Sequence, residues 1–259
     1  MKQIIQILFL ILFGQCVFAQ TNSSILKVLS YNIYHGETSG SYDLDMIATI
    51  INKLNPDLVG LQEVDKNTNR TNQIDLAREL GSKTGLNSVF CKAIDFDGGE
   101  YGIAILTKKK FFNHKKVALP FVEGNEPRML HSVETTTTSG DTILFYNTHL
   151  DYKPNSLERI KQAKLINEIA LTSKYPVVLT GDLNDVPGSD CINVFEKVWQ
   201  TSYSKENPTP TFPSNNPNRK IDYVLSYPNN KWKILHHEVI CDSIASDHCA
   251  YFVILELQN

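Results

Sequence analysis

Short apolar runs with the composition of β-strands alternate along this chain with segments of helical periodicity, and this alternation limits the fold to the α/β class. Two clear strand-like runs are "ILKVLSYNI" (25–33) and "DLVGLQEV" (57–64). Between them, "YDLDMIATIINKLNP" (42–56) carries apolar residues at helical spacing, with Asp43 as the expected N-cap and Pro56 as the stop. Strands therefore follow one another through helices for at least part of the chain.

Hairpins accompany the helices, which predicts mixed sheets instead of a purely parallel one. The segment "TSGD" (138–141) has the composition of a turn between two strand-like runs. A second helix is expected at 72–85, closed by Gly85, and a long amphipathic helix at 155–173. The remaining strand-like runs are 88–94, 101–108, 115–121, 128–136, 142–150, 176–185, 221–226, 232–240 and 249–257.

The first nineteen residues have the pattern of a secretory signal peptide, with Lys2, the apolar run "IIQILFLILF" and a cleavage site after Ala19. The apolar run is shorter than the roughly 18–20 residues that a spanning helix needs. A lipoprotein anchor on Cys16 is the alternative. Cleavage would leave 240 of the 259 residues and, because Lys2 is lost, a formal charge of −4 instead of −3. We expect an exported, periplasmic or secreted protein with no transmembrane segment.

Residues 20–259 are expected to form a single domain, since no linker or low-complexity tract divides them and a hydrophobic content of 42% supports a large core. The Pro- and Asn-rich segment 204–220 is interpreted as a long surface loop. Export permits disulfides, and Cys241 with Cys249 flank a short loop, so we expect that pair to be bonded.

Polar residues gather where the strand-like runs end. Taken one at a time, several have simple structural explanations: Asn32 as a turn residue, His149 as a histidine at the edge of the core. Glu63 in "LQEV" and Asp222 in "KIDYVL" differ, because a carboxylate inside an apolar strand needs a partner or a cation. The full set of such residues is Asn32, Glu63, His149, Asp182, Asn184, Asp222, Asp247 and His248.

These residues lie in an ordered series of motifs that resembles the endonuclease/exonuclease/phosphatase superfamily. The motifs are "SYNIYHG", "DLVGLQEVD", "YGIAIL", "FYNTHLD", "VVLTGDLND", "KIDYVL" and "SDHCAYF", which together span essentially the whole chain after residue 19. Members of the superfamily include pancreatic-type deoxyribonuclease, abasic-site endonucleases, neutral sphingomyelinases and inositol polyphosphate 5-phosphatases. The resemblance implies a four-layer α/β/β/α sandwich of two mixed sheets, hydrolysis of a phosphoester, and dependence on Mg²⁺ or Mn²⁺.

The resemblance also implies a metal site. Glu63 and Asp247 would be the carboxylates that hold the cation, with Asn32 beside them as an amide ligand or as the group that orients Glu63. Such a set fits the chemistry of Mg²⁺, which is typically bound by one or two carboxylates, water and substrate phosphate.

The remaining roles implied by the resemblance are catalytic. Asp182 would activate the attacking water or hold a second metal ion, and Asn184 would fix that carboxylate or contact a phosphate oxygen. Asp222 and His248 would form an Asp–His pair, in which the carboxylate selects the imidazole tautomer and raises its pKa. His149 would donate to a nonbridging phosphate oxygen. Which group is the general base and which the general acid is left open.

Two further residues are candidates for substrate binding. Arg128 can clamp a phosphate with its planar guanidinium, with a surface salt bridge as the alternative. Tyr101 is a candidate for the wall of the substrate pocket. His35, Glu126, Asp151 and Lys220 lie near the motifs and are given no role.

Three functions remain open at this point. The first is a phosphodiesterase, the second a phosphomonoesterase of the inositol-phosphatase kind, and the third an inactive binding module. A nuclease is one form of the first. The negative net charge, a sequence pI of about 6.2 and the lack of a basic stripe with interleaved aromatics favour a small or lipid-linked phosphodiester over a long polyanion. We expect a monomer that acts on such a substrate.

Overall fold

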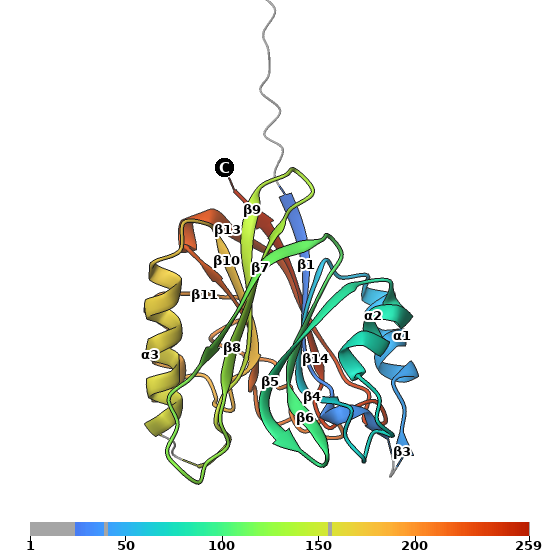
Figure 1. Cartoon of the computed structure of the whole chain (residues 1–259). Helices are drawn as coiled ribbons and strands as arrows, with labels where there is room; N and C mark the ends of the chain where they lie inside the picture. Colours follow the sequence, from blue (N-terminus) through green and yellow to red (C-terminus); the bar gives the residue numbers. More distant parts are fainter. Residues whose placement is uncertain (1–23, 39–40, 155–156, 259) are drawn as a thin grey trace, which may run out of the picture.

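The computed structural model describes residues 24–38, 41–154 and 157–258, which fold into four layers. Figure 1 shows two β-sheets packed face to face, with α1 (Asp45–Leu54) and α2 (Leu76–Thr84) on one outer face and α3 (Leu157–Leu171) on the other. A fourth helix, α4 (Asp190–Glu196), packs against α3. The four-layer α/β/β/α sandwich expected from the sequence is therefore confirmed.

Each of the two main sheets has six strands and is mixed. The first sheet has the order β13 (Trp232–Ile240), β14 (Ala250–Leu257), β1 (Ser24–Asn32), β4 (Leu58–Lys66), β6 (Gly99–Thr107) and β5 (Asn87–Phe96). The second sheet has the order β11 (Gln200–Thr201), β12 (Asp222–Tyr227), β10 (Val177–Asp182), β9 (Thr142–His149), β8 (Met129–Thr136) and β7 (Phe111–Ala118). A short ribbon joins β2 (Glu37–Thr38) to β3 (Ser41–Tyr42), and single 3₁₀ turns occur at η1 (Tyr34–Gly36) and η2 (Asn229–Lys231).

One parallel pair lies at the centre of each sheet. Strand β1 pairs in parallel with β4, and β9 pairs in parallel with β10, whereas the other neighbours are antiparallel. These four central strands therefore end at one edge of the sandwich, and the polar residues at their ends are brought together there. In Figure 1 this edge lies at the bottom, opposite the point where β1 begins and where the chain ends.

Helices α1 and α2 lie where the sequence pattern predicts them, with one N-cap different, whereas the short α4 was not predicted. Helix α2 begins after Asp75, whose carboxylate accepts a hydrogen bond from the Arg78 amide, and it ends at Gly85, which adopts a left-handed φ of 70°. Helix α1 has Leu44 at the N-cap position, so the prediction of Asp43 was wrong by one residue. The Asp43 carboxylate instead accepts a hydrogen bond from the Asp45 amide in the first turn.

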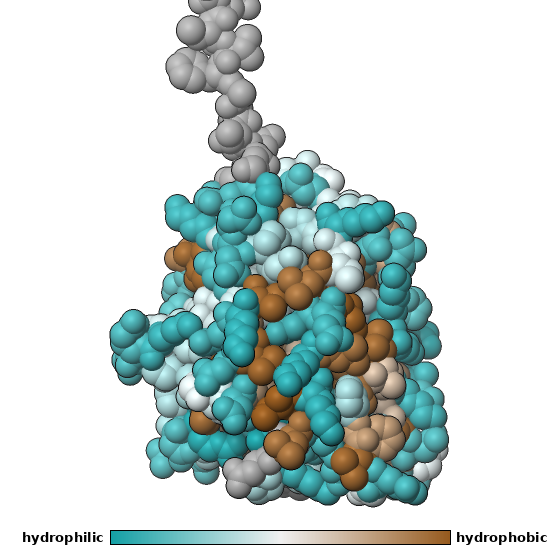
Figure 2. Space-filling view, turned by 90° about the vertical axis from the view of Figure 1, so that its left-hand side faces the viewer, coloured by the Kyte–Doolittle hydropathy of each residue, from teal (hydrophilic) through white to brown (hydrophobic). Residues whose placement is uncertain are grey.

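Helix α3 is less amphipathic than expected, because polar side chains occupy part of its buried face. Glu158, Arg159, Gln162 and Asn167 are all buried, whereas Leu157 and Leu171 are 72% and 56% exposed. Figure 2 turns this side of the molecule to the viewer and shows apolar side chains lying among polar ones. The buried polar groups bond to neighbouring loops: Gln162 accepts from the Asp151 amide and donates to the Pro120 carbonyl.

Three apolar clusters hold the layers together. One lies between α1, α2 and the first sheet, a second lies between α3, α4 and the second sheet, and a third lies between the two sheets. Burial of these side chains is the main stabilising contribution to such a sandwich.

Toward the site, the contact between the sheets becomes polar and very close. Gly60 in β4 faces Thr180 of β10 so closely that an added β-carbon would lie 1.9 Å from Thr180 Oγ1 and 2.6 Å from Asn147 Oδ1. Asn147 of β9 also crosses the gap: its amide donates to the carbonyls of Leu61 and Ala104, at 2.8 and 2.9 Å. The absence of a side chain at residue 60 therefore sets the spacing of the sheets beside the site.

The segment 204–220 differs from the exposed loop predicted for it. Residues 205–207, 215–216 and 218–219 are exposed, but Thr211, Ser214 and Lys220 are buried, and the first two contact the loop before β14. The Thr211 carbonyl accepts from the Cys249 amide at 2.8 Å, and the Ser214 amide donates to the Asp247 carbonyl at 2.7 Å. Composition alone could not reveal these anchors.

Two other predictions concern the chain ends and the cysteines. The predicted signal peptide, residues 1–19, lies outside the described residues. Cys241 and Cys249 form a disulfide, as expected, while Cys91 and Cys191 are buried free thiols. Among the described residues, no helix combines the length and the apolar character needed to cross a membrane.

Candidate active site

The polar residues predicted from the sequence meet at the shared edge of the two sheets. The register of the second sheet places the last residue of β10, Asp182, between His149 of β9 and Asp222 of β12. In the first sheet, Asn32 is the last residue of β1, and Asp247 and His248 lie in the loop that leads into β14, with Cys249 between them and the strand. Two sheets thus supply facing halves of one site.

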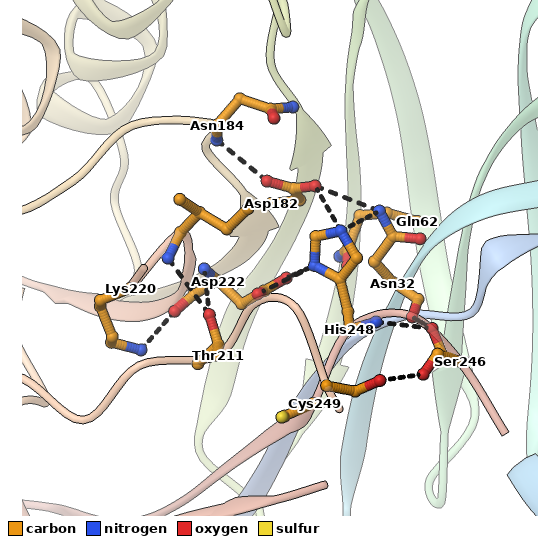
Figure 3. Close-up of polar contacts among 12 residues, drawn as sticks. Asn32, Gln62, Asp182, Asn184, Thr211, Lys220, Asp222, Ser246, His248 and Cys249 are labelled. Atoms are coloured by element: carbon orange, nitrogen blue, oxygen red, sulfur yellow. Dashed lines mark hydrogen bonds and ion pairs between the residues drawn. The ribbon is translucent and has the colours of Figure 1, made fainter. Parts of the chain in front are cut away.

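The imidazole of His248 lies between two buried carboxylates (Figure 3). Its Nδ1 is 3.1 Å from both oxygens of Asp222, and its Nε2 is 3.7 Å from Asp182 Oδ2. All three residues are at least 95% buried. The Asp222–His248 pair predicted from the motifs is therefore present in the structure as a hydrogen-bonded pair.

This arrangement shifts the pKa values of His248 and Asp182. Burial alone would lower the pKa of His248, but Asp222 and Asp182 outweigh it and raise that pKa to about 10. Burial raises the pKa of Asp182 to about 7, against the lowering effect of the His248 charge. His248 consequently holds a proton at neutral pH, while Asp182 titrates near neutrality.

Asp182 is held by hydrogen bonds on both oxygens. The backbone amide of Asn184 donates to Oδ1 at 2.9 Å, and the side-chain amide of Asn32 donates to Oδ2 at 3.1 Å. Asn184 adopts a left-handed φ of 51°, and its side chain donates to the Leu150 carbonyl at 3.1 Å. The tight turn in "GDLND" thus fixes the Asp182 carboxylate at the end of its strand.

Glu63 projects into the site from a bulge in β4. The pairing of β4 with β6 shifts register between Leu61 and Val64, and Glu63 has a left-handed φ of 55°. Asn32 Nδ2 donates to Glu63 Oε1 at 3.0 Å. Burial would raise the pKa of Glu63, but nearby His35, His149 and Asn32 lower it to about 2, so the group is ionised.

Asn32 is occupied on both ends of its amide. Its nitrogen bonds Glu63 and Asp182, and its oxygen accepts from the backbone amide of Tyr34 at 3.1 Å. Of the two roles considered for Asn32, these contacts favour the orienting one over direct metal ligation.

The residues fit a divalent cation at Glu63 and Asp247. The buried Oδ1 of Asp247 has no hydrogen-bond partner among the described residues, and Glu63 is an ionised carboxylate close enough to raise the pKa of Asp247, after the larger effect of burial. Hard oxygen donors of this kind suit Mg²⁺ or Mn²⁺. A second possible ion position lies deeper, where ligand atoms of Asp182, Asp222 and His248 all fall within 4.8 Å of one another.

His149 faces the same centre. Its Nε2 is 3.4 Å from Asp182 Oδ2, and its buried Nδ1 has no partner within the described part of the chain. Burial, reinforced by the positive charge of Arg128, holds the pKa of His149 well below its usual range. His149 is thus a neutral imidazole that can donate one N–H.

The two predicted substrate residues border the site. Arg128 is 4% exposed, its Nη1 lies 2.9 Å from Glu126 Oε1, and its guanidinium lies 5.9 Å from the Tyr152 ring centre. Tyr101 lies beside Glu63, and burial followed by the Glu63 charge raises its pKa well above the usual range. The salt bridge to Glu126 does not exclude phosphate contact, since the Nε of Arg128 has no partner among the described residues.

Several supporting residues were missed from the sequence. Gln62 donates to Asn147 Oδ1 at 2.7 Å, linking β4 to β9 beneath Asn32. Ser246 Oγ donates to the Asn32 carbonyl at 2.7 Å and accepts from the His248 amide at 3.1 Å. Lys220 is buried next to Asp222, and burial lowers its pKa to about 7. Of these contacts, the sequence could have indicated only the bond between Gln62 and Asn147, because a Gln and an Asn are unusual inside the apolar runs "GLQEV" and "FYNTHL".

Glu63 and Asp247 line two neighbouring clefts, which share Tyr34. The first, of about 300 Å³, contains Glu63 and is walled by Arg70, Phe96 and Tyr101. The second, of about 430 Å³, contains Asp247 and is walled by Phe212 and Ile244. Each of the two carboxylates that could hold the cation therefore lines a cleft of its own.

A family model described as the Endonuclease/Exonuclease/phosphatase family matches residues 29–248. No curated protein sequence matches significantly.

Solved structures with the same fold include proteins from two bacteria and from human. A protein of unknown function from Enterococcus faecalis has a TM-score of 0.74 at 22% identity, covering 90% of this chain and 100% of that chain. The human Nocturnin catalytic domain, solved with a sulfate anion, has a TM-score of 0.72 at 17% identity, with 91% of this chain and 94% of that chain covered. A mannosyl-6-phosphatase from Bacteroides thetaiotaomicron has a TM-score of 0.66 at 18% identity, with 89% of this chain and 99% of that chain covered. At these identities the similarity establishes the fold alone.

Proposed function

The chain belongs to the endonuclease/exonuclease/phosphatase family, whose members hydrolyse phosphoesters, and on that premise we propose that it is a metal-dependent phosphodiesterase. The proposed reaction is attack of water on phosphorus with cleavage of one P–O ester bond, which gives a phosphomonoester and an alcohol. A divalent cation bound by Glu63 and Asp247 would draw negative charge from the phosphate oxygens.

Asp182 is the proposed general base. Its pKa of about 7 lies close to the operating pH, which suits a group that accepts a proton from water. Both of its oxygens are held by Asn32 and Asn184, so the carboxylate is fixed before substrate arrives. Water placed between Asp182 and the phosphate would therefore lose its proton to a preoriented acceptor.

His248 and His149 are the proposed donors to the phosphate. His248 is protonated at neutral pH, and Asp222 fixes its orientation through Nδ1, which leaves Nε2 as the donor toward the site. His149 is neutral and can donate one N–H to a nonbridging oxygen as negative charge builds. We assign Arg128 to the same phosphate, because its buried Nε has no partner among the described residues.

The observation that carries the choice of a diester is the pair of clefts that flank Glu63 and Asp247. A phosphomonoester has one organic substituent and would use only one cleft. The formal charge of −3 for the whole chain supports a small or lipid-linked diester over duplex DNA, whose binding depends on many basic contacts. Export through residues 1–19 remains part of the proposal, and the Cys241–Cys249 disulfide supports an oxidising compartment.

The test is a comparison of specificity constants with Mg²⁺ present. The substrates are bis-p-nitrophenyl phosphate, p-nitrophenyl phosphate, a phospholipid diester and duplex DNA, each at about 50 and 200 mM salt. We expect the diesters to be preferred and duplex DNA to be cut poorly. Preference for p-nitrophenyl phosphate would assign a phosphomonoesterase, and efficient DNA cleavage that collapses with salt would assign a nuclease.

A further inference from the structure

Lys220 is a buried basic side chain for which the proposed reaction has no direct use. Its side chain is 3% exposed, and it lies two residues before Asp222. Burying a lysine is costly because the charged ammonium loses its hydration. A cation in such a place therefore needs compensating contacts, and their location indicates what the residue does.

The ammonium group of Lys220 connects the two sheets. Its Nζ donates a hydrogen bond to the backbone carbonyl of Asp222, at the start of β12 in the second sheet (Figure 3). The same Nζ lies 3.3 Å from the ring centre of Tyr251, which belongs to β14 in the first sheet. Strand β14 begins two residues after His248, so Lys220 joins the backbone that carries Asp222 to the strand that follows His248.

Aromatic faces supply the remaining environment of the cation. The ring centres of Tyr223 and Tyr203 lie 5.0 and 5.9 Å from Nζ. The hydroxyl groups of these rings bond elsewhere, Tyr203 to Glu196 and Tyr223 to the carbonyls of Asp185 and Lys220. The faces are thus left to the ammonium, in the arrangement of a cation–π cage.

Thr211 makes a second connection from the other side of Asp222. Its hydroxyl accepts from the backbone amides of Ile221 and Asp222, at 3.1 and 3.2 Å. Its carbonyl accepts from the amide of Cys249, next to His248. The backbone of Asp222 is therefore held at its amide by Thr211 and at its carbonyl by Lys220, and both residues reach the segment of His248.

We propose that Lys220 is a positioning residue, which fixes Asp222 against His248 across the two sheets and thereby sets the orientation of the imidazole. The residue contacts neither the proposed metal carboxylates nor the clefts for substrate. It acts through the Asp222–His248 hydrogen bond alone. The consequence for turnover rests on the proposed hydrolytic function, whereas the consequence for the hydrogen bond does not.

The test uses Lys220→Met in the full-length protein, with Lys205→Met as the matched control. Lys205 lies in the same segment, but its side chain is 58% exposed and pairs with Glu196. In the metal-free protein, the Nδ1–H proton of His248 is observed by NMR and assigned by its loss in Asp222→Asn. We expect Lys220→Met to shift or broaden this signal and Lys205→Met to leave it unchanged.

The kinetic readout is kcat and KM on the best diester. We expect kcat to fall about 10²-fold with KM unchanged, since displacement of a catalytic group by about 1 Å has an effect of that size. A folded Lys220→Met protein with the wild-type NMR signal and the wild-type kcat would overturn the proposal. If Lys220→Met does not fold, Lys220→Gln takes its place with the same expected changes.

Failure of the proposed function and failure of the role proposed for Lys220 give different results. If the wild-type protein hydrolyses no phosphoester, the proposed function fails, and the His248 signal alone then decides the role of Lys220. A shifted signal supports it, and an unchanged signal refutes it.

Discussion

Replacement of Gly60 by alanine tests whether the spacing of the two sheets controls the site. The added methyl group would lie 1.9 Å from Thr180 Oγ1 and 2.6 Å from Asn147 Oδ1. Rotation of Thr180 does not relieve the overlap cheaply, because its hydroxyl donates to the Tyr146 carbonyl and to Asn147 Oδ1. The sheets must therefore move apart locally, by about 1 Å, to reach even a close contact of about 3 Å.

The displacement sets the expected loss of stability and of activity in Gly60→Ala. Overpacking of a core typically costs about 1–3 kcal/mol. For a domain of this size, each kcal/mol lowers Tm by about 2–4 °C. Glu63 lies three residues beyond Gly60 on one sheet, and Asp182 lies two residues beyond Thr180 on the other. Because the site is built across this gap, we expect kcat/KM to fall about 10²-fold.

The assay combines thermal unfolding followed by circular dichroism with kcat/KM on bis-p-nitrophenyl phosphate. The control is a double-mutant cycle with Thr180→Ala, which removes the nearest atom. We expect the double mutant to be more stable and more active than Gly60→Ala alone. A Gly60→Ala protein with unchanged Tm and unchanged activity would refute the reasoning.

Three further predictions follow from the site. Excess EDTA should abolish activity and Mg²⁺ or Mn²⁺ should restore it, with the circular dichroism spectrum unchanged; full activity in chelator would remove the metal from the account. His248→Ala and Asp222→Asn should each lower kcat by about 10²–10⁴-fold, and the double mutant should be little worse, because paired groups are non-additive; multiplying effects would show that the two act separately. Replacing Cys241 and Cys249 by serine should lower the free energy of unfolding by about 2–3 kcal/mol and also reduce activity, since the closed loop carries Asp247 and His248; denaturant unfolding and kcat measure both, and no change in either would contradict the role of the loop.

Local patterns predicted the α/β class, the mixed sheets and the polar residues at the strand ends, whereas the four-layer sandwich and the roles of the site residues were implied by the resemblance to the family. Asn32, His149 and Asp182 end apolar strands, and strands in such a sandwich end at a common edge. Asp75 and Gly85 have the capping chemistry that sets the ends of a helix on its own. These features can be interpreted one segment at a time.

The contacts that span the sheets could not be predicted in this way. Segment 204–220 has the composition of an exposed loop, yet Thr211 in its middle and Lys220 at its end hold Asp222. The bond from Gln62 to Asn147 joins residues that are 85 positions apart, and only the packing of the sheets brings them together. The Asp43 N-cap was wrong because capping depends on backbone angles, and Leu44 takes the flanking position here.

The most direct test of the central claim is hydrolysis of a phosphodiester in ¹⁸O-labelled water by the Mg²⁺-loaded protein, with the product examined by ³¹P NMR. The account predicts one solvent oxygen in a phosphomonoester product, little release of inorganic phosphate, and loss of the reaction in Asp182→Asn. Incorporation of the label into the alcohol instead of the phosphate would contradict attack on phosphorus, and undiminished turnover by Asp182→Asn would contradict the assignment of the base.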